Sequence, residues 1–274
     1  MKQRSLLQRM AAAPHAVWSV LFIIAPMIFV VAYAFTDADG SFTFSNFGEL
    51  SQYSGVFVRS ILFALIATMI CLVIAYPLAY LIARTAPKTQ KILIMLIMLP
   101  MWTNFLIRTY SLMNILEDNG VLNTLLSKIG LGPIPMINTA GAVIFGMVYD
   151  FLPYMILPIY TVMSKMDVRL LEAAADLGCN PVKTALRVTF PLSISGIVSG
   201  VTMVFVPSVS TFYISQKLGG GNFDLVGDAI ERQFLMDYNY HVGAAMSFVL
   251  MILIVISMAV MKRFSDEDNE EVLV

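Results

Sequence analysis

Charged residues are scarce in this chain: only 13% of its 274 residues are Asp, Glu, Lys or Arg, whereas 58% are hydrophobic. A water-soluble domain of this size has too little interior to hide that much apolar surface. The formal net charge is -1 and no basic run occurs, which excludes a surface that binds nucleic-acid phosphates. The solvent of most of the chain must therefore be lipid.

Cysteine and catalytic motifs are also nearly absent. The two cysteines, Cys71 in an apolar run and Cys179 in a polar segment, exclude a disulfide framework and have no metal-ligand spacing. No Gly-x-x-x-x-Gly-Lys-Ser/Thr, Gly-x-Ser-x-Gly or His-Glu-x-x-His pattern occurs, so the chain lacks a phosphate loop, a serine-hydrolase motif and a zinc-protease motif. We expect no catalytic residue, metal site or bound cofactor in it.

What the sequence does contain is long apolar runs between charged residues. A helix of roughly 20 residues crosses about 30 Å of hydrocarbon, and six runs qualify. Pro100 interrupts the third and Arg108 lies in its outer end, but helices in lipid tolerate proline where neighbours satisfy the backbone. We predict an all-α, polytopic membrane protein, a single transmembrane domain over residues 1–274. Its six helices are expected at residues 17–35, 60–82, 92–116, 139–163, 192–214 and 242–261.

The basic residues predict the orientation of these helices. With the N-terminus in the cytoplasm, the cytoplasmic segments hold twelve Lys and Arg and the opposite side holds five. Cytoplasmic loops carry the excess of Lys and Arg in membrane proteins, so both termini are predicted to be cytoplasmic. The acidic residues at 264–274 then form a solvated cytoplasmic end.

The longest cytoplasmic segment, residues 164–191, predicts a hairpin of two short helices. Asp167 is a suitable N-cap for a helix over residues 168–177, because its carboxylate can accept from a free backbone N–H of the first turn. Gly178 supplies the left-handed residue that commonly ends a helix. The first helix of the hairpin is thus bounded at both ends.

The second helix of the hairpin begins with Asn180 as N-cap and Pro181 in the first turn, and it is expected to end near Phe190, before Pro191. In the first helix the three alanines at 173–175 let another surface approach the backbone closely. We favour a docking element over the alternative of a solvated connector, because a connector does not need two capped helices with an apolar face.

The same residues resemble a known motif. The run Glu-Ala-Ala-Ala-Asp-Leu-Gly at 172–178, with Pro181 after it and Phe-Pro-Leu at 190–192 closing it, resembles the EAA loop of ABC importer permeases. In that family the loop forms a coupling helix that sits in a cleft of the cytosolic ATPase. The resemblance implies a type I ABC importer permease fold. It assigns ATPase docking to Arg169, Leu171, Glu172, Ala173, Ala174, Asp176 and Gly178.

Other blocks resemble the permeases of spermidine/putrescine importers. They lie at residues 99–104, 107–110, 119–123, 148–154, 157–160, 212–215, 219–220 and 233–235. The resemblance implies a bacterial inner-membrane subunit that pairs with a homologous second permease. It also implies two cytosolic ATPase subunits, which bind ATP and Mg²⁺, and an extracytoplasmic binding protein that delivers the solute.

Asp150 is the residue that bears most directly on the cargo. It lies near the middle of the predicted fourth span, where an isolated carboxylate costs at least ~2.5 kcal/mol and usually faces a cavity or a partner. A carboxylate among aromatic faces holds an organic ammonium by ion pairing and cation–π attraction. Two readings stay open: Asp150 binds a cationic substrate, or it is structural, either in a pair, for instance with Arg108, or as a protonated carboxyl hydrogen-bonded to a neighbouring helix.

Aromatic and polar neighbours complete the predicted substrate path. Each aromatic residue taken alone is also explained by the enrichment of Trp and Tyr at membrane interfaces. Asn104 is one turn before Arg108 and is expected either to line the path or to join helices. Tyr213 is added because it lies in one of the resembling blocks. The predicted path is Asp150, Tyr154, Trp102, Asn104, Tyr110 and Tyr213.

Two rival functions remain at this level. The docking motif does not identify the cargo, so a permease for another small solute is the main alternative. An ion-coupled secondary transporter is a further one, with Asp150 as its ion site, although it would not need the cytosolic hairpin. In the fifth span Gly196 and Gly200 form a small-xxx-small pair, which predicts close helix packing and not a binding site.

Overall fold

The structure is a computed structural model that describes residues 6–271. In that range the regular elements are helices, apart from one isolated antiparallel bridge between Thr36 and Phe42. The predicted all-α fold is therefore confirmed. Most of the predicted acidic end belongs to the last helix, which runs to Glu271. Residues 1–5 and 272–274 lie outside the described range, so a solvated end stays a prediction.

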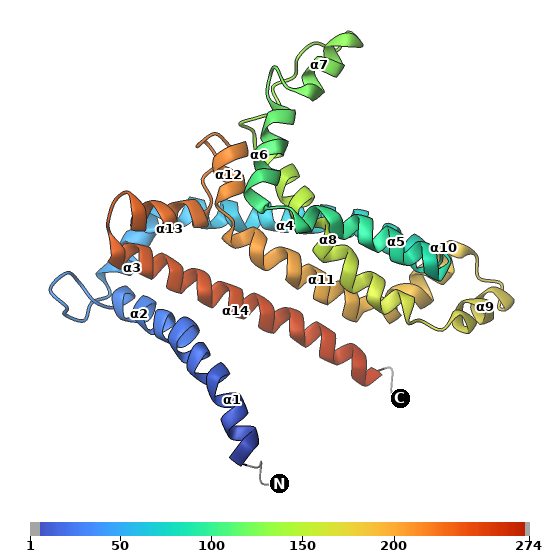
Figure 1. The fold of residues 1–274 in the computed structure, drawn as a ribbon, viewed down its shortest axis with the longest axis horizontal. Coiled ribbons are helices and arrows are strands. Elements are labelled where there is room, and N and C mark those ends of the chain that lie inside the picture. The colour runs from blue at the N-terminus through green and yellow to red at the C-terminus, as the bar shows by residue number, and fades with distance from the viewer. Residues whose placement is uncertain (1–5, 272–274) are drawn as a thin grey trace. The chain divides into compact units, whose positions relative to one another are not determined.

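The described chain forms two compact units. The first comprises the residues up to Gly55 together with Ala229–Leu253, and the second comprises Val56–Asp228 together with the residues from Ile254 onward. That the whole chain acts as one transmembrane domain stays a prediction. In chain order the helices (Figure 1) are α1 (Leu6–Ser19), η1 (Val20–Ile24), α2 (Ala25–Ala34), α3 (Ser45–Glu49), η2 (Leu50–Tyr53), α4 (Ser54–Ala83), α5 (Pro87–Met98), η3 (Leu99–Trp102), α6 (Phe105–Leu116), α7 (Val121–Lys128), α8 (Ala140–Ser164), α9 (Val168–Asp176), α10 (Pro181–Thr184), η4 (Ala185–Thr189), α11 (Phe190–Ser210), α12 (Tyr213–Leu218), α13 (Val226–Leu235) and α14 (Tyr240–Glu271).

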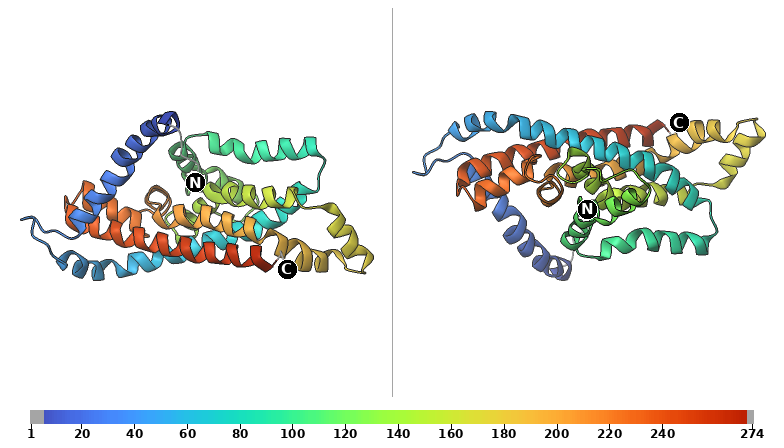
Figure 2. Two further views of the ribbon diagram at one scale, coloured as in Figure 1. Left: turned by 90° about the horizontal axis from the view of Figure 1, so that it is seen from below. Right: turned by 90° about the horizontal axis from the view of Figure 1, so that it is seen from above.

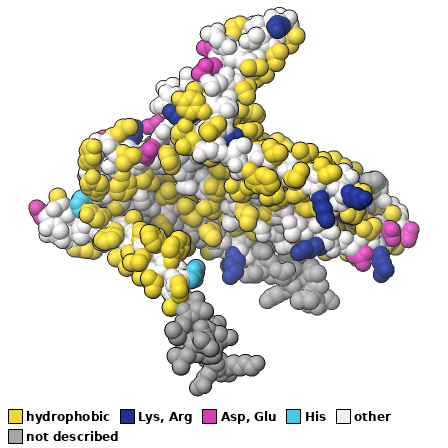
Figure 3. All heavy atoms as spheres, in the orientation of Figure 1, with side chains coloured by type: hydrophobic (Ala, Val, Ile, Leu, Met, Phe, Trp, Pro, Cys, Tyr) yellow, Lys and Arg dark blue, Asp and Glu magenta, His cyan; other side chains and the backbone are white. Residues whose placement is uncertain are grey.

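Five stretches of helix are long and apolar enough to cross a bilayer. They are Ala13–Ala34, Ser45–Ala83, Ala140–Ser164, Val182–Ser210 and Tyr240–Arg263. A sixth span arises if the bent pair Pro87–Trp102 and Phe105–Lys128 is counted as one. Each of the six predicted ranges overlaps one of these. The outward apolar side chains agree with lipid as the solvent: Phe22 and Val73 are 65% and 68% exposed, and hydrophobic side chains cover much of the face in Figure 3.

The third predicted span, residues 92–116, is not one continuous helix, and that prediction is wrong. The chain bends by 92° between η3 and α6, because Thr103 and Asn104 both take extended backbone conformations. Pro100 in η3 has no N–H to continue the ladder. Asn104 then starts the new helix as its N-cap: its side-chain oxygen accepts from Leu106 N at 2.8 Å.

Two further helix ends differ from the predictions. The hairpin's second helix does not stop before Pro191 but continues through the π-helical turn η4 into α11. A π turn absorbs the missing donor of a proline with little cost, since the backbone ladder is already widened there. The fifth predicted span, 192–214, in turn breaks at Thr211, which is extended, and α12 begins at Tyr213.

The first unit is held by small and aromatic residues. Ala34, Ala244 and Ala245 are buried together, so α2 and the first half of α14 approach closely. Phe35 packs its ring against neighbouring rings, with Phe47 at 5.0 Å between centroids. The side chain of Asn46 donates to the carbonyl oxygen of Ala34 at 3.0 Å, which satisfies a backbone group at the end of α2.

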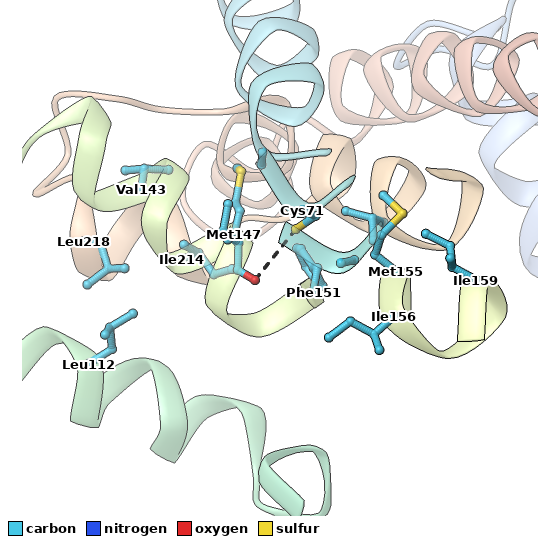
Figure 4. Close-up of a cluster of buried hydrophobic side chains, with 14 of the residues drawn as sticks. Cys71, Leu112, Val143, Met147, Phe151, Met155, Ile156, Ile159, Ile214 and Leu218 are labelled. Atoms are coloured by element: carbon cyan, nitrogen blue, oxygen red, sulfur yellow. Dashed lines mark hydrogen bonds between the residues drawn. The ribbon is translucent and has the colours of Figure 1, made fainter. Parts of the chain in front are cut away.

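The core of the second unit lies around α8. α8 and α11 run side by side in the views of Figures 1 and 2. Figure 4 shows Val143 and Met147 of α8 close to Ile214 of α12. The thiol of Cys71 on α4 lies 3.8 Å from the carbonyl oxygen of Val148, the dashed line in that view. These contacts join α4, α8 and α12.

The predicted small-xxx-small packing is confirmed. A Cβ at Gly196 would meet the carbonyl oxygen of Pro158 at 3.0 Å, and one at Gly200 would meet the sulfur of Met155 at 2.8 Å. Both glycines of α11 thus face the backbone or core side chains of α8. The two helices lie close together because these positions carry no side chain.

We predict that Gly200→Val destabilises the folded protein by about 1–3 kcal/mol, because the new methyl groups overlap Met155. Ser199→Val is the matched control, since Ser199 is the exposed neighbour on the same helix. The measurement is chemical unfolding of the purified protein in detergent. Equal unfolding midpoints for the two variants would contradict the packing.

Candidate functional site

The hairpin of residues 164–191 has the caps that the sequence predicts. The Asp167 carboxylate accepts from Arg169 N at 3.0 Å and begins α9. Gly178, just after the helix, has φ of 79°, in the left-handed region that favours glycine. Asn180 Oδ1 accepts from Lys183 N at 2.8 Å and begins α10. The hairpin's conformation is therefore set by its own residues.

The predicted docking residues are mostly exposed. Five of them are exposed on α9 or just after it, namely Arg169, Glu172, Ala173, Asp176 and Gly178. Leu171 is half-buried, and Ala174 is buried within this chain. The side chain of Ala174 is thus turned away from any partner. The hairpin also exposes apolar side chains that were not predicted as docking residues, among them Leu170, Leu177, Val182 and Leu186.

A buried ion pair joins the broken third span to α8. Asp150 is fully buried and pairs with Arg108 of α6, whose side chain is 9% exposed. Thr109 donates to the second carboxylate oxygen at 3.3 Å. Arg108 Nη1 also donates to the carbonyl oxygen of Pro100 at 2.8 Å. One guanidinium therefore neutralises the carboxylate and adds a hydrogen bond to a carbonyl that also accepts from Thr103 at the helix break.

Of the two readings of Asp150, the structure shows the pair with Arg108. A second cation cannot reach this carboxylate in the described conformation, because it is fully buried and already bonded. Its role as a substrate ligand stays a prediction that requires the pair to open. Breaking such a buried pair by removing one partner typically costs about 3–5 kcal/mol.

Three other predicted path residues do not surround Asp150. Trp102 of η3 is 74% exposed, and Asn104 uses its side chain to cap α6. Tyr154, one turn after Asp150 on α8, is 38% exposed and packs near Phe151, with 6.4 Å between ring centroids. Their places in a path stay predictions.

Tyr110 and Tyr213, in contrast, are brought together. Tyr110 lies on α6 and Tyr213 on α12, and the Lys217 ammonium sits over both rings, 5.3 Å and 5.5 Å from their centroids. The Phe105 ring lies 6.2 Å from that of Tyr213 and 5.9 Å from the Arg108 guanidinium. Lys217 and Arg108 thus lie along one row of aromatic rings, which we call the aromatic row: Tyr110, Tyr213 and Phe105.

Sequence reasoning missed three members of this group: Phe105, Thr109 and Lys217. Phe105 lies about one turn before Arg108 on the same helix and Thr109 directly follows it, so nearness in the sequence was an available signal. Lys217 follows Tyr213 by four residues, the spacing of neighbours on a helix surface, and this spacing was the available signal for it.

A fourth missed group is Asp228, at the start of α13. It is buried, and its carboxylate accepts from Ser215 Oγ at 2.6 Å and from Leu225 N at 2.7 Å. Burial raises the pKa of this carboxyl to about 6, against the bonds from Ser215 and Leu225, which lower it. These bonds fix the chain between α12 and α13.

Comparison with known proteins decides the family. The model of the binding-protein-dependent transport system inner membrane component matches residues 75–267, which include the Arg108–Asp150 pair and the whole hairpin. This chain belongs to that family. The matched region of this inner membrane component begins within α4 and ends within α14.

Relatives of this inner membrane component extend over nearly its full length. The spermidine/putrescine transport system permease protein PotB of Haemophilus influenzae is 38% identical, covering 97% of this chain and 96% of that protein. PotB of Escherichia coli K12 is 37% identical over 93% of this chain and 96% of its own. A crystal structure of a bacterial ABC transporter that imports alginate has a TM-score of 0.77 at 20% identity, covering 95% of each chain. It confirms the permease fold.

We predict that Arg108→Gln lowers the free energy of unfolding by about 3 kcal/mol, because it leaves the Asp150 carboxylate buried without a cation. The double variant Arg108→Gln/Asp150→Asn should recover more than half of that loss, since neither charge then remains. Unfolding in detergent measures both, and Lys128→Gln, at an exposed lysine of α7, is the control. If the double variant lost as much stability as Arg108→Gln and Asp150→Asn lose together when measured singly, a pair would be excluded.

Proposed function

We propose that this chain is the membrane-spanning permease subunit of an ATP-driven polyamine importer. The observation that carries the proposal is the 38% identity over 97% of the chain to a spermidine/putrescine permease protein. Identity at this level over almost the whole length includes the helices that would line the path as well as the docking hairpin. It therefore supports a common cargo in addition to a common fold.

The cytoplasmic hairpin supports coupling to a separate ATPase. It presents the apolar side chains of Leu170, Leu177 and Val182 to solvent, beside the exposed polar residues Arg169 and Glu172. An exposed apolar patch with a polar rim is typical of a protein interface. ATP and Mg²⁺ would bind to the ATPase subunits, because this sequence has no phosphate loop of its own.

The distribution of charge supports the orientation and the partners. Lys and Arg side chains gather over α5, α9 and α10 in Figure 3, at the end that we assign to the cytoplasm of a bacterial inner membrane. Both termini would then be cytoplasmic. A homologous second permease would complete the path, two ATPases would bind the hairpins, and an extracytoplasmic binding protein would deliver the solute.

The aromatic row supports a cationic cargo. Two cations of the chain itself, Lys217 and Arg108, already lie over aromatic rings, namely those of Tyr110, Tyr213, Phe105 and Tyr149. Aromatic faces attract organic ammonium groups by about 0.5–2 kcal/mol each. Polyamines carry two or more such groups on a flexible alkyl chain.

The ATPases would drive the permease, through the hairpins, between a state open to the outside and a state open to the cytoplasm.

The deciding experiment is reconstitution of the complex with its binding protein in proteoliposomes. Uptake of labelled putrescine and spermidine, and their stimulation of ATP hydrolysis, are compared with sugars, amino acids and anions. We expect stimulation by the polyamines alone. Stimulation by another solute would assign that solute as the cargo, and uptake without the ATPases would favour an ion-coupled transporter.

The coupling role of the hairpin predicts the effect of Gly178→Val. A β-branched side chain at a φ of 79° costs at least about 1–2 kcal/mol locally, so the turn after α9 is expected to move. We predict that ATPase co-purification or uptake falls at least tenfold. Cys179→Val, at the next position, is the control. Normal co-purification together with normal uptake in Gly178→Val would refute the assignment.

A further inference from the structure

Lys217 occupies a position that a cationic cargo would be expected to take. Its ammonium lies over the rings of Tyr110 and Tyr213, at 5.3 Å and 5.5 Å. Tyr213 is one turn before it on α12, and Tyr110 comes from α6. Two helices and two aromatic faces therefore form one ammonium site, and a side chain of the protein fills it.

The other cation of the aromatic row is held much more firmly. Arg108 lies 5.9 Å from both the Phe105 and the Tyr149 ring centroids, but it is also paired with the buried Asp150. Around Lys217, within the part of the chain that the structure describes, no carboxylate oxygen lies within salt-bridge distance of the ammonium. The lysine is therefore the cation that can leave at the lower cost.

The surroundings of Lys217 permit such a departure. Tyr110 is 46% exposed, and both Tyr213 and Lys217 are partly exposed, so this chain leaves one side of the site uncovered. A lysine side chain is a compact charge on a flexible four-carbon stem. It can swing away without any change in the helices that carry the rings.

We propose that Lys217 is an internal competitor that occupies the ammonium site of Tyr110 and Tyr213 in the substrate-free permease and is displaced by an ammonium group of the polyamine. This inference rests on the proposed function. A substrate ammonium needs the same two ring faces, and two like charges at that spacing repel, so the two cations exclude each other. While no substrate is bound, Lys217 in this site would also keep small cations out of the path.

The first test measures binding of labelled putrescine to the reconstituted complex held with ATP and vanadate, above the amount bound by the binding protein alone. Lys217→Gln frees the rings, and we expect the affinity for putrescine to rise by about 3-fold to 10-fold, in keeping with the loss of one competing cation. Lys217→Arg keeps the cation and should bind as the wild type does. Lys128→Gln removes an exposed lysine of α7 and should also have no effect.

The second test follows the lysine directly in the wild-type complex. A membrane-impermeant acetylating reagent is applied with and without putrescine, and modification of Lys217 is quantified by mass spectrometry relative to Lys128. We expect putrescine to raise the relative rate at Lys217 at least threefold, because the displaced amine is free in solution. This readout does not depend on a variant that folds.

The outcomes separate the two ideas. If the wild-type complex binds putrescine but neither Lys217→Gln nor the acetylation rate changes as expected, the lysine is a structural contact and the inference is overturned while the proposed function stands. If the wild-type complex binds no putrescine and binds another solute, the cargo assignment fails, and the displacement by a polyamine fails with it.

Discussion

The fold of the second unit depends on one buried ion pair, which lies at the break between η3 and α6. Arg108 lies just after the bend between η3 and α6, and its guanidinium bonds both the Asp150 carboxylate and the carbonyl oxygen of Pro100. In lipid the carboxylate and the guanidinium would each be costly alone, because no water is present to solvate them. The pair therefore ties the position of the bend to α8, and through α8 to α11, which packs along it.

The aromatic row and this pair are parts of one arrangement. Phe105 contacts the Arg108 guanidinium on one side and the Tyr213 ring on the other, so the fully buried charge and the solvent-accessible lysine are linked through aromatic contacts. A cation-selective path built from these residues, as we propose, would need no exposed carboxylate. Its selectivity would arise from the ring faces, whose attraction depends on the charge and shape of the cargo.

Local signals were readable from the sequence, and contacts between distant residues were not. The caps Asp167, Gly178 and Asn180 act on residues next to them, so the starts of both hairpin helices and the end of the first were predicted correctly. The bend after Pro100 was missed because hydropathy averages over a window and does not register two extended residues. The partner of Asp150 was left open between two readings, since 42 residues separate Arg108 from it. Lys217 was overlooked because its second ring, that of Tyr110, comes from another helix.

The hairpin is connected differently on its two sides. Before α9 the chain passes through residues 165–167, which are not helical, whereas after α10 it continues through η4 into α11 without a break. The continuous helix after α10 is stiff along its axis, whereas the non-helical residues 165–167 before α9 bend more easily. If the hairpin is the docking element that we propose, a force on it would shift α11 directly, whereas α8 would follow only through side-chain contact. Such unequal coupling would make the two helices slide along each other.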